Sequence, residues 1–130
     1  MVTKYLTIKK PQEFRLPPNN CQKIHTKSFV ILVGNTPLQY LPNKENELNL
    51  LDFCRIGITV SKQVSKKATS RNLIKRRIKN SLKFIIVKYA KNHHDYIIIA
   101  KKNIIEENFQ NIYNEIKFAF KKINNQSHNL

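Results

Sequence analysis

The sequence predicts an α/β (α+β) two-layer sandwich, in which a mostly antiparallel four-stranded sheet is covered by two helices. Short runs of β-branched residues indicate strands, and two longer segments place apolar residues at helical spacing. Their order is strands, helix, strand, helix, which is typical of a sheet packed against helices. The 130 residues, 41% of them apolar, predict a single domain over residues 1–130 with a core at about 8–122 and a flexible polar tail at 124–130.

The first half of the chain predicts three strands. Residues 1–20 are polar and contain three prolines, so we expect at most a short helix at 12–16. Residues 28–34 are an apolar run, and a weaker strand at 22–26 completes a hairpin with them. Residues 54–60 alternate between two faces of a strand. The apolar face of that strand carries Ile56, Ile58 and Val60.

The second half predicts two helices around one strand. Residues 70–91 repeat apolar side chains at spacings of four, four, three and four, which predicts a helix with Thr69 or Ser70 as its N-cap. Residues 95–100 form a buried strand. Residues 106–122 form the last helix, with glutamates at its positive end and lysines at its negative end. The two apolar stripes are Ile74, Ile78, Leu82, Ile85 and Tyr89, and Phe109, Ile112, Tyr113, Ile116 and Phe120.

The charge distribution indicates a polyanionic partner. The chain has 24 Lys and Arg residues against 8 Asp and Glu, a formal net charge of +16. Residues 53–94 contain no acid at all and hold 12 of the 24 cations. Like charges one helical turn apart are destabilising, and a solvated helix face usually mixes both signs. The uncompensated run is therefore explained better by an anionic surface that neutralises it.

RNA is the polyanion that the pattern favours. A membrane-surface helix needs free apolar residues, whereas the apolar stripe of this helix is needed to cover the sheet. We find no helix-turn-helix, zinc finger or coiled-coil basic region that would read duplex DNA. No apolar run reaches the length of a membrane span or a signal peptide, so we expect a cytoplasmic protein. Single-stranded or folded RNA remains.

Other chemistry is not indicated. Cys21 and Cys54 lack a CxxC neighbour and are expected to be reduced structural thiols. His93 and His94 fall in a turn, where solvated side chains are the simpler interpretation. A two-metal protein nuclease needs clustered carboxylates, which the basic segment lacks, so we expect neither a catalytic residue nor a metal site in the protein.

Three segments carry a resemblance to a known family. The strand end Val60-Ser61-Lys62-Gln63 is followed by the helix start Arg71-Asn72-Leu73-Ile74-Lys75-Arg76 and by a strand, Asp95-Tyr96-Ile97-Ile98-Ile99-Ala100-Lys101. In order and spacing they resemble the protein subunit of bacterial ribonuclease P, over roughly residues 8–122. In this chain Leu73 stands where the family has the second arginine of its R-N-R motif.

The resemblance implies the non-catalytic protein subunit of a ribonucleoprotein endoribonuclease that matures the 5′ end of tRNA. Its implied partners are the ribonuclease P RNA subunit and the 5′ leader of precursor tRNA, with no membrane and no obligate protein partner. Mg²⁺ is held mainly by the RNA subunit and the substrate and not by a protein site. The resemblance also implies a left-handed crossover from strand 54–60 through the long helix to strand 95–100, although right-handed crossovers are the general rule.

We expect two RNA-contacting surfaces. The motif surface, Arg71, Asn72, Lys75, Arg76 and Lys79, faces phosphates of the RNA subunit. A leader cleft on the sheet, with Phe14, Phe29, Ser61 and Lys62 at its edge, guides the single-stranded leader, although Phe29 is equally suited to core packing. The full set of RNA-binding candidates is Phe14, Ser61, Lys62, Lys66, Lys67, Arg71, Asn72, Lys75, Arg76, Arg77 and Lys79.

One alternative stays open on composition alone: a protein that binds ribosomal RNA or assists ribosome assembly without a cleavage role. A protein-only nuclease is disfavoured by the missing carboxylate cluster.

Overall fold

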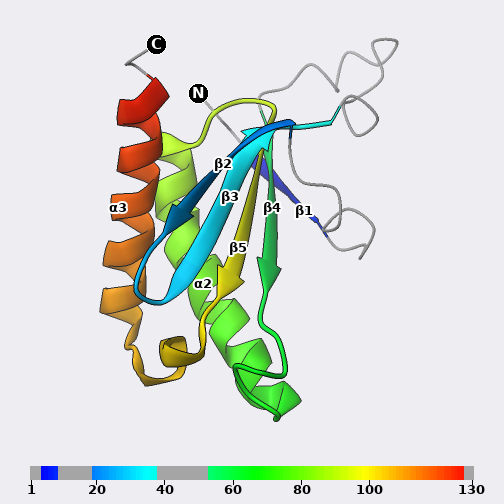
Figure 1. Ribbon diagram of the computed structural model, residues 1–130, viewed down its shortest axis with the longest axis vertical. Coiled ribbons are helices and arrows are strands. Elements are labelled where there is room, and N and C mark those ends of the chain that lie inside the picture. The colour runs from blue at the N-terminus through cyan, green and yellow to red at the C-terminus, as the bar shows by residue number, and fades with distance from the viewer. Residues whose placement is uncertain (1–3, 9–18, 38–52, 128–130) are drawn as a thin grey trace.

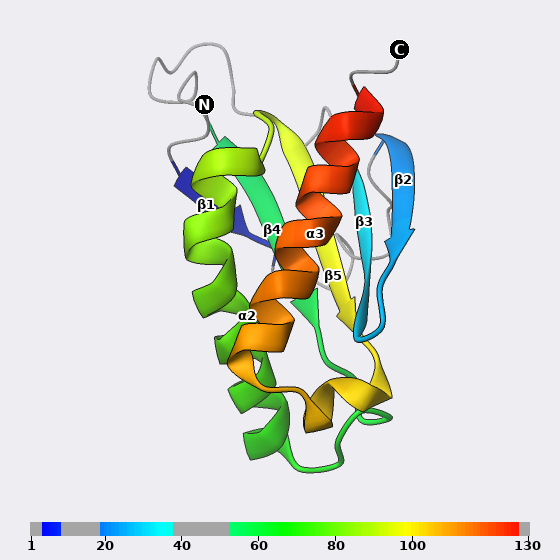
Figure 2. The same cartoon turned by 90° about the vertical axis from the view of Figure 1, so that its left-hand side faces the viewer.

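The structure is a computed structural model that describes residues 4–8, 19–37 and 53–127, and these residues form one sheet with two long helices. Both helices lie against the same face of the sheet, side by side (Figures 1 and 2). A short 3-10 helix, η3, precedes the last helix. The elements in chain order are β1 (Lys4–Thr7), β2 (Asn19–His25), β3 (Phe29–Asn35), β4 (Phe53–Thr59), α2 (Ala68–Tyr89), β5 (His94–Ala100), η3 (Lys102–Glu106) and α3 (Phe109–Ser127).

The predicted two-layer α+β class is confirmed, with a correction to the sheet. All four predicted strands are present, including the β2–β3 hairpin, but β1 adds a fifth and the order is β1-β4-β5-β3-β2. Two strand pairings are parallel, β1 with β4 and β4 with β5, and two are antiparallel, so the sheet is mixed and not mostly antiparallel. The chain passes from β4 through α2 to the adjacent parallel strand β5. The left hand of this crossover stays a prediction.

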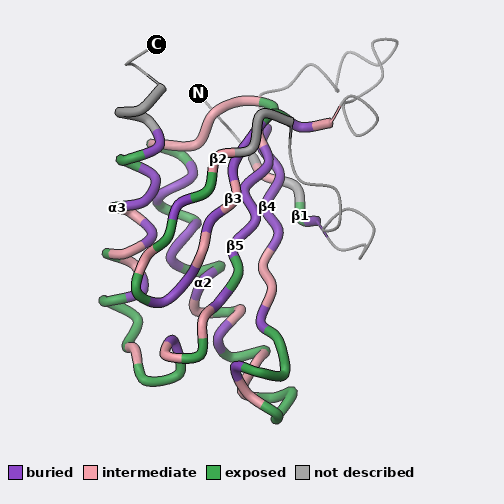
Figure 3. The backbone as a smooth tube through the Cα atoms, in the orientation of Figure 1, coloured by how far each residue is buried: buried purple, intermediate pink, exposed green. Residues whose placement is uncertain are grey.

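The core lies between the sheet and the two helices, and both the strands and the helices carry residues coloured as buried in Figure 3. Alternation along β4 and β5 sends Cys54, Ile56, Tyr96 and Ile98 toward the helices. The stripe predicted for the long helix is buried from Ile74 to Ile85, while Tyr89 is only partly buried. Removing so much apolar area from water is the main force that holds both helices on the sheet.

Both helices begin at other residues than the sequence predicts. The N-cap of α2 is Lys67, two residues before Thr69, and it makes no side-chain capping bond. In α3 the cap is Asn108, whose side-chain oxygen accepts the backbone N–H of Asn111 at 2.8 Å. Helix α3 also continues to Ser127, past its predicted end at residue 122.

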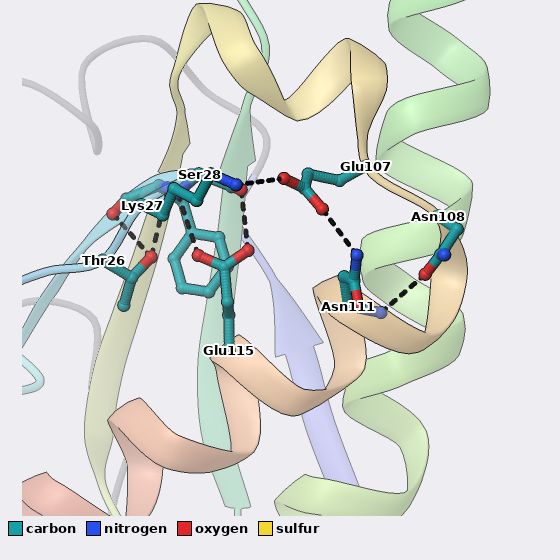
Figure 4. Close-up of polar contacts among 8 residues, drawn as sticks. Thr26, Lys27, Ser28, Glu107, Asn108, Asn111 and Glu115 are labelled. Carbon is teal, nitrogen blue, oxygen red and sulfur yellow. Dashed lines mark hydrogen bonds and ion pairs between the residues drawn. The ribbon is translucent and has the colours of Figure 1, made fainter.

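Polar contacts fix the start of α3 to the β2–β3 turn (Figure 4). Glu115 accepts hydrogen bonds from both the backbone N–H and the hydroxyl of Ser28, at 2.9 and 2.7 Å. Lys27 forms an ion pair with Glu107 at 3.1 Å. The hydrogen bond from the Asn111 side chain, followed by the contact with Lys27, holds the pKa of Glu107 below its usual value. Two acids that follow the basic segment in sequence, Glu107 and Glu115, are thus used to position α3.

The opposite face of the sheet contains a buried ion pair. The Nε of Arg55 lies 3.6 Å from Oδ1 of Asp95, and both side chains are almost fully buried. The hydroxyl of Thr36 donates to the same carboxylate oxygen at 2.8 Å. Arg55 is therefore a structural cation and does not add to the exposed charge of the basic segment.

Candidate nucleic-acid interface

A rigid loop joins β4 to the cationic helix. The backbone N–H groups of Val64 and Ser65 both donate to the carbonyl oxygen of Ser61, at 3.0 and 3.4 Å. The side chain of Val64 is 5% exposed and packs in the core, so it attaches the loop to the core. The loop is thereby held in one shape, and its three lysines are exposed around it. These lysines are Lys62, Lys66 and Lys67.

Arg71 has a structural role that the sequence did not reveal. Its Nη1 donates to the carbonyl oxygens of Ser65 and Lys66, at 2.9 and 3.0 Å. The guanidinium therefore holds the loop against the first turns of α2. The helix begins before Thr69, and the backbone N–H of Arg71 donates to the carbonyl oxygen of Lys67 at 3.1 Å. A guanidinium has five N–H donors, so one arginine can hold the loop and still offer donors to a phosphate.

The motif surface is formed by α2 largely as the sequence predicts. Asn72, Arg76 and Lys79 are exposed, and Arg71 and Lys75 are half-buried. Helix α2 has no acid in its first turn, and among the described residues no carboxylate pairs with any of its cations. The surface therefore presents an unneutralised positive charge, which suits a phosphate backbone.

Arg77 does not join the motif surface. Helical periodicity places it about half a turn from Lys75 and Lys79, on the side of α2 that turns toward α3. Its carbonyl oxygen accepts the hydroxyl of Ser81 at 3.0 Å, and Ser81 is fully buried at the base of that side.

A hollow of about 240 Å³ lies between α2 and the edge of the sheet. Lys75 and Lys79 form its helical wall, while Tyr5 and Thr7 of β1 form the opposite wall. The parallel pairing of β1 with β4 produces this wall, because it aligns Tyr5 with Cys54 and Thr7 with Ile56 on the helix-facing side. The floor is apolar and consists of Ile8, Ile56 and Ile58.

The hollow differs from the predicted leader cleft in its aromatic residues. Phe29 is 0% exposed and belongs to the core, so the core interpretation holds and the stacking interpretation is wrong. Phe14 lies outside the described residues. Tyr5 is the aromatic residue that reasoning from sequence missed. Its signal was the short and mostly apolar run Tyr5-Leu6-Thr7-Ile8, which the surrounding lysines and prolines obscured.

The remaining titratable residues have structural positions. Cys54 is a free, fully buried thiol, as predicted, and burial followed by the charge of Asp95 raises its pKa to about 12. The ring of His93 packs on Phe53 with centroids 4.8 Å apart, and its backbone has a φ of 57°. Within the described ranges, no group of three or more His, Cys, Asp and Glu residues could hold a metal ion, and no helix is long and apolar enough to cross a membrane.

Comparisons with known proteins agree on one family. The model of the family described as Ribonuclease P matches residues 2–124. The chain is 31% identical over 118 residues to the ribonuclease P protein component of Rickettsia peacockii, covering 85% of this chain and 90% of that protein. It is 32% identical over 114 residues to the protein of the same description from Rickettsia bellii, covering 87% and 89%.

Solved structures show the same architecture. The RNase P protein of Staphylococcus aureus matches with a TM-score of 0.68 and 27% identity, over 90% of this chain and 94% of that chain. The RNase P protein of Thermotoga maritima matches with a TM-score of 0.69 over 89% and 96%. At 20% identity, the second likeness concerns the fold alone.

Proposed function

The chain belongs to the ribonuclease P protein family, and from this premise we propose that it binds the ribonuclease P RNA through the motif surface and guides the 5′ leader of precursor tRNA through the hollow beside β1. Members of the family are protein components of a ribonucleoprotein endoribonuclease, so the RNA subunit is the partner of this chain. The observation that carries the proposal is that unneutralised cations of α2 border a hollow with an aromatic wall.

The motif surface suits the phosphates of a folded RNA. Asn72, Arg76 and the lysines of the adjoining loop are exposed, and Arg71 holds that loop against the helix. Because hydrogen bonds hold the backbone of this loop, less backbone entropy is lost when its lysines meet phosphate oxygens. Each such contact releases a condensed counterion, so the affinity depends steeply on salt. Ser61 and Lys62 extend this surface to the end of β4.

The hollow suits a single strand. Proteins that bind single-stranded nucleic acid combine a positive groove along the backbone with aromatic rings on which bases stack. Here Lys75 and Lys79 supply the charge, and Tyr5 supplies a half-buried ring on the opposite wall. Because Lys75 and Lys79 belong both to the motif surface and to the wall of the hollow, a leader strand in the hollow would lie directly beside the bound RNA subunit.

In this proposal the protein binds and orients RNA, while the RNA subunit and the substrate hold the Mg²⁺ ions. The Mg²⁺ ions supply the activation of water and the stabilisation of the leaving oxygen. The protein's cations lower the repulsion between two RNA molecules that must approach closely. A single RNA-binding domain in the cytoplasm, where precursor tRNA is processed, is part of the same proposal.

Reconstitution with RNA tests this function. The protein is added to a bacterial ribonuclease P RNA at low magnesium, and cleavage of a precursor tRNA is followed with a long leader and with a leader of one nucleotide. We expect stimulation with both, because the RNA subunit is bound, and more with the long leader. The Lys75→Ala/Lys79→Ala variant should lose the preference for the long leader. No stimulation by the unaltered protein, together with tight binding to ribosomal RNA fragments, would instead support the assembly-protein alternative.

A further inference from the structure

A second groove lies on the other side of α2, between the C-terminal half of that helix and α3. Its volume is about 380 Å³, within the range of pockets that take organic ligands. Within the described part of the chain, it shares no lining residue with the hollow beside β1. Figure 2 shows the two helices that border it in front of the sheet. The lining residues are Lys83, Phe84, Ile85, Val87, Lys88, Tyr89, Tyr113 and Lys117.

The groove exposes apolar side chains of α2 that lie outside the core, next to Tyr113, which packs partly against the core. Phe84 is 68% exposed and Val87 is 50% exposed, although the buried stripe of α2 continues beside them. On α3, Phe109 is 42% exposed and its ring stacks on Tyr113 with centroids 6.5 Å apart. Exposed aromatic residues grouped in this way, rather than scattered singly, are typical of binding surfaces.

The charge around these rings has one sign. Lys83, Lys88 and Lys117 line the groove, and no acid among the described residues does. The Nζ of Lys117 lies 6.0 Å from the ring centroid of Tyr113, so the cation sits over an aromatic face. Arg77 belongs to the same side of α2, because Arg77, Phe84 and Lys88 follow each other at intervals of seven and four residues. The cation that the motif surface leaves out is thus placed beside this groove.

We propose that this aromatic–lysine groove is a second binding site for unpaired RNA, separate from the motif surface and from the hollow beside β1. A base stacks on the exposed ring of Phe84, beside Tyr113, and phosphates pair with Lys88 and Lys117. An acidic protein segment would satisfy the lysines but would leave the exposed ring faces unused, whereas single-stranded RNA uses both. The site goes beyond the proposed function, because neither docking on the RNA subunit nor guiding the leader requires it.

Fluorescence anisotropy with a labelled 12-nucleotide oligouridylate measures binding to the full chain. The measurement uses a Lys75→Ala/Lys79→Ala background, which weakens RNA binding in the hollow beside β1. Phe84→Ala should weaken binding by about 5- to 160-fold, the range expected when one base loses its stacking partner. Lys88→Ala/Lys117→Ala should flatten the dependence of log K on log salt by about 1.4 units for two single-strand phosphates. Phe118→Ala and Lys121→Ala/Lys122→Ala are matched controls, since all three residues are exposed on α3 and none lines the groove.

The outcomes separate this inference from the proposed function. If Phe84→Ala binds the oligouridylate as tightly as Phe118→Ala, the groove is not an RNA site, whatever happens to leader-dependent cleavage. If the groove variants lose binding to polyglutamate but not to the oligouridylate, the occupant is an acidic protein and the inference is overturned. A 4-thiouridine oligonucleotide tests the unaltered protein: its crosslinks should fall on the peptides that contain Phe84 or Tyr113, and their absence there contradicts the site.

Discussion

Replacing Arg71 and Lys75 together should weaken binding to the RNA subunit and change its salt dependence. Lys75 is free of carboxylates among the described residues, and Arg71 uses one of its nitrogens for two loop carbonyls. Each phosphate that loses its cation flattens the slope of log K against log salt by about 0.7 to 0.9 unit. Because Arg71 has donors left over, we expect Arg71→Ala/Lys75→Ala to flatten the slope by about one to two units.

This magnitude can be measured by filter binding of the ribonuclease P RNA at several salt concentrations. If the slope changes by 1.5 units, the affinity of the unaltered protein divided by that of the variant falls by a factor of about 8 between 50 and 200 mM salt. Lys121→Ala/Lys122→Ala removes the same charge from an exposed part of α3 and controls for net charge. An unchanged slope in a variant with an unchanged circular-dichroism spectrum would refute the assignment of Arg71 and Lys75 to the RNA contact.

Arg71→Lys separates charge from position. Lysine keeps the charge but cannot reach two carbonyls with one planar fork. If the fork holds the loop, this variant should keep the salt slope, yet hydrogen exchange of the loop N–H groups of Val64 and Ser65 should accelerate. Equal exchange in Arg71→Lys and the unaltered protein would show that Val64 alone fixes the loop.

The remaining predictions concern stability and reactivity. Asp95→Ala removes the carboxylate from beside the buried guanidinium of Arg55 and should lower the free energy of unfolding, measured in urea, by about 3 to 5 kcal/mol. A loss below about 1 kcal/mol would contradict a stabilising buried pair. Glu115→Ala should cost about 1.5 to 3 kcal/mol, because two hydrogen bonds from Ser28 end on its carboxylate, whereas Asn114→Ala on the exposed side of α3 should cost little in the same urea titration. Burial raises the pKa of Cys54 to about 12, so at pH 8 only about one thiol in ten thousand is ionised. Iodoacetamide should therefore label the Cys54 peptide in guanidinium and not in the folded protein, and mass spectrometry can detect the label. With a net charge of +16, the free protein should partly unfold at low salt and recover with sulfate or phosphate, and a melting temperature independent of salt would count against this.

The sequence predicts the elements whose pattern is local. Strand β4 alternates and helix α2 repeats apolar residues at helical spacing, so one face of each is determined by neighbours along the chain. The cationic side of α2 follows from the same period, which is why the motif surface could be predicted residue by residue. Whether it binds RNA stays a prediction that the experiments above address.

Features that depend on distant parts of the chain could not be predicted. Strand β1 is four residues long and owes its place to parallel pairing with β4, some fifty residues away. The aromatic wall of the hollow therefore needed the fold. The position of Phe29 could not be predicted for a similar reason. Alternation gives the face of β3 on which it lies, but only the packing of α2 and α3 shows that this face is buried. The groove beside Phe84 depends on how the two helices lie relative to each other.

The fold also sorts the cations of the basic segment, which look alike in sequence. Arg55 is buried against Asp95, Arg71 closes a loop, and Lys75 and Lys79 border the hollow, while Lys88 lies on the other side of the same helix. The cations that no carboxylate neutralises repel one another in the free protein, and they are also the cations that RNA would neutralise. RNA binding should therefore remove the charge repulsion that destabilises the folded state. It follows that variants of exposed cations should raise the stability of the free protein while they lower its affinity, whereas variants of Arg55 should lower both.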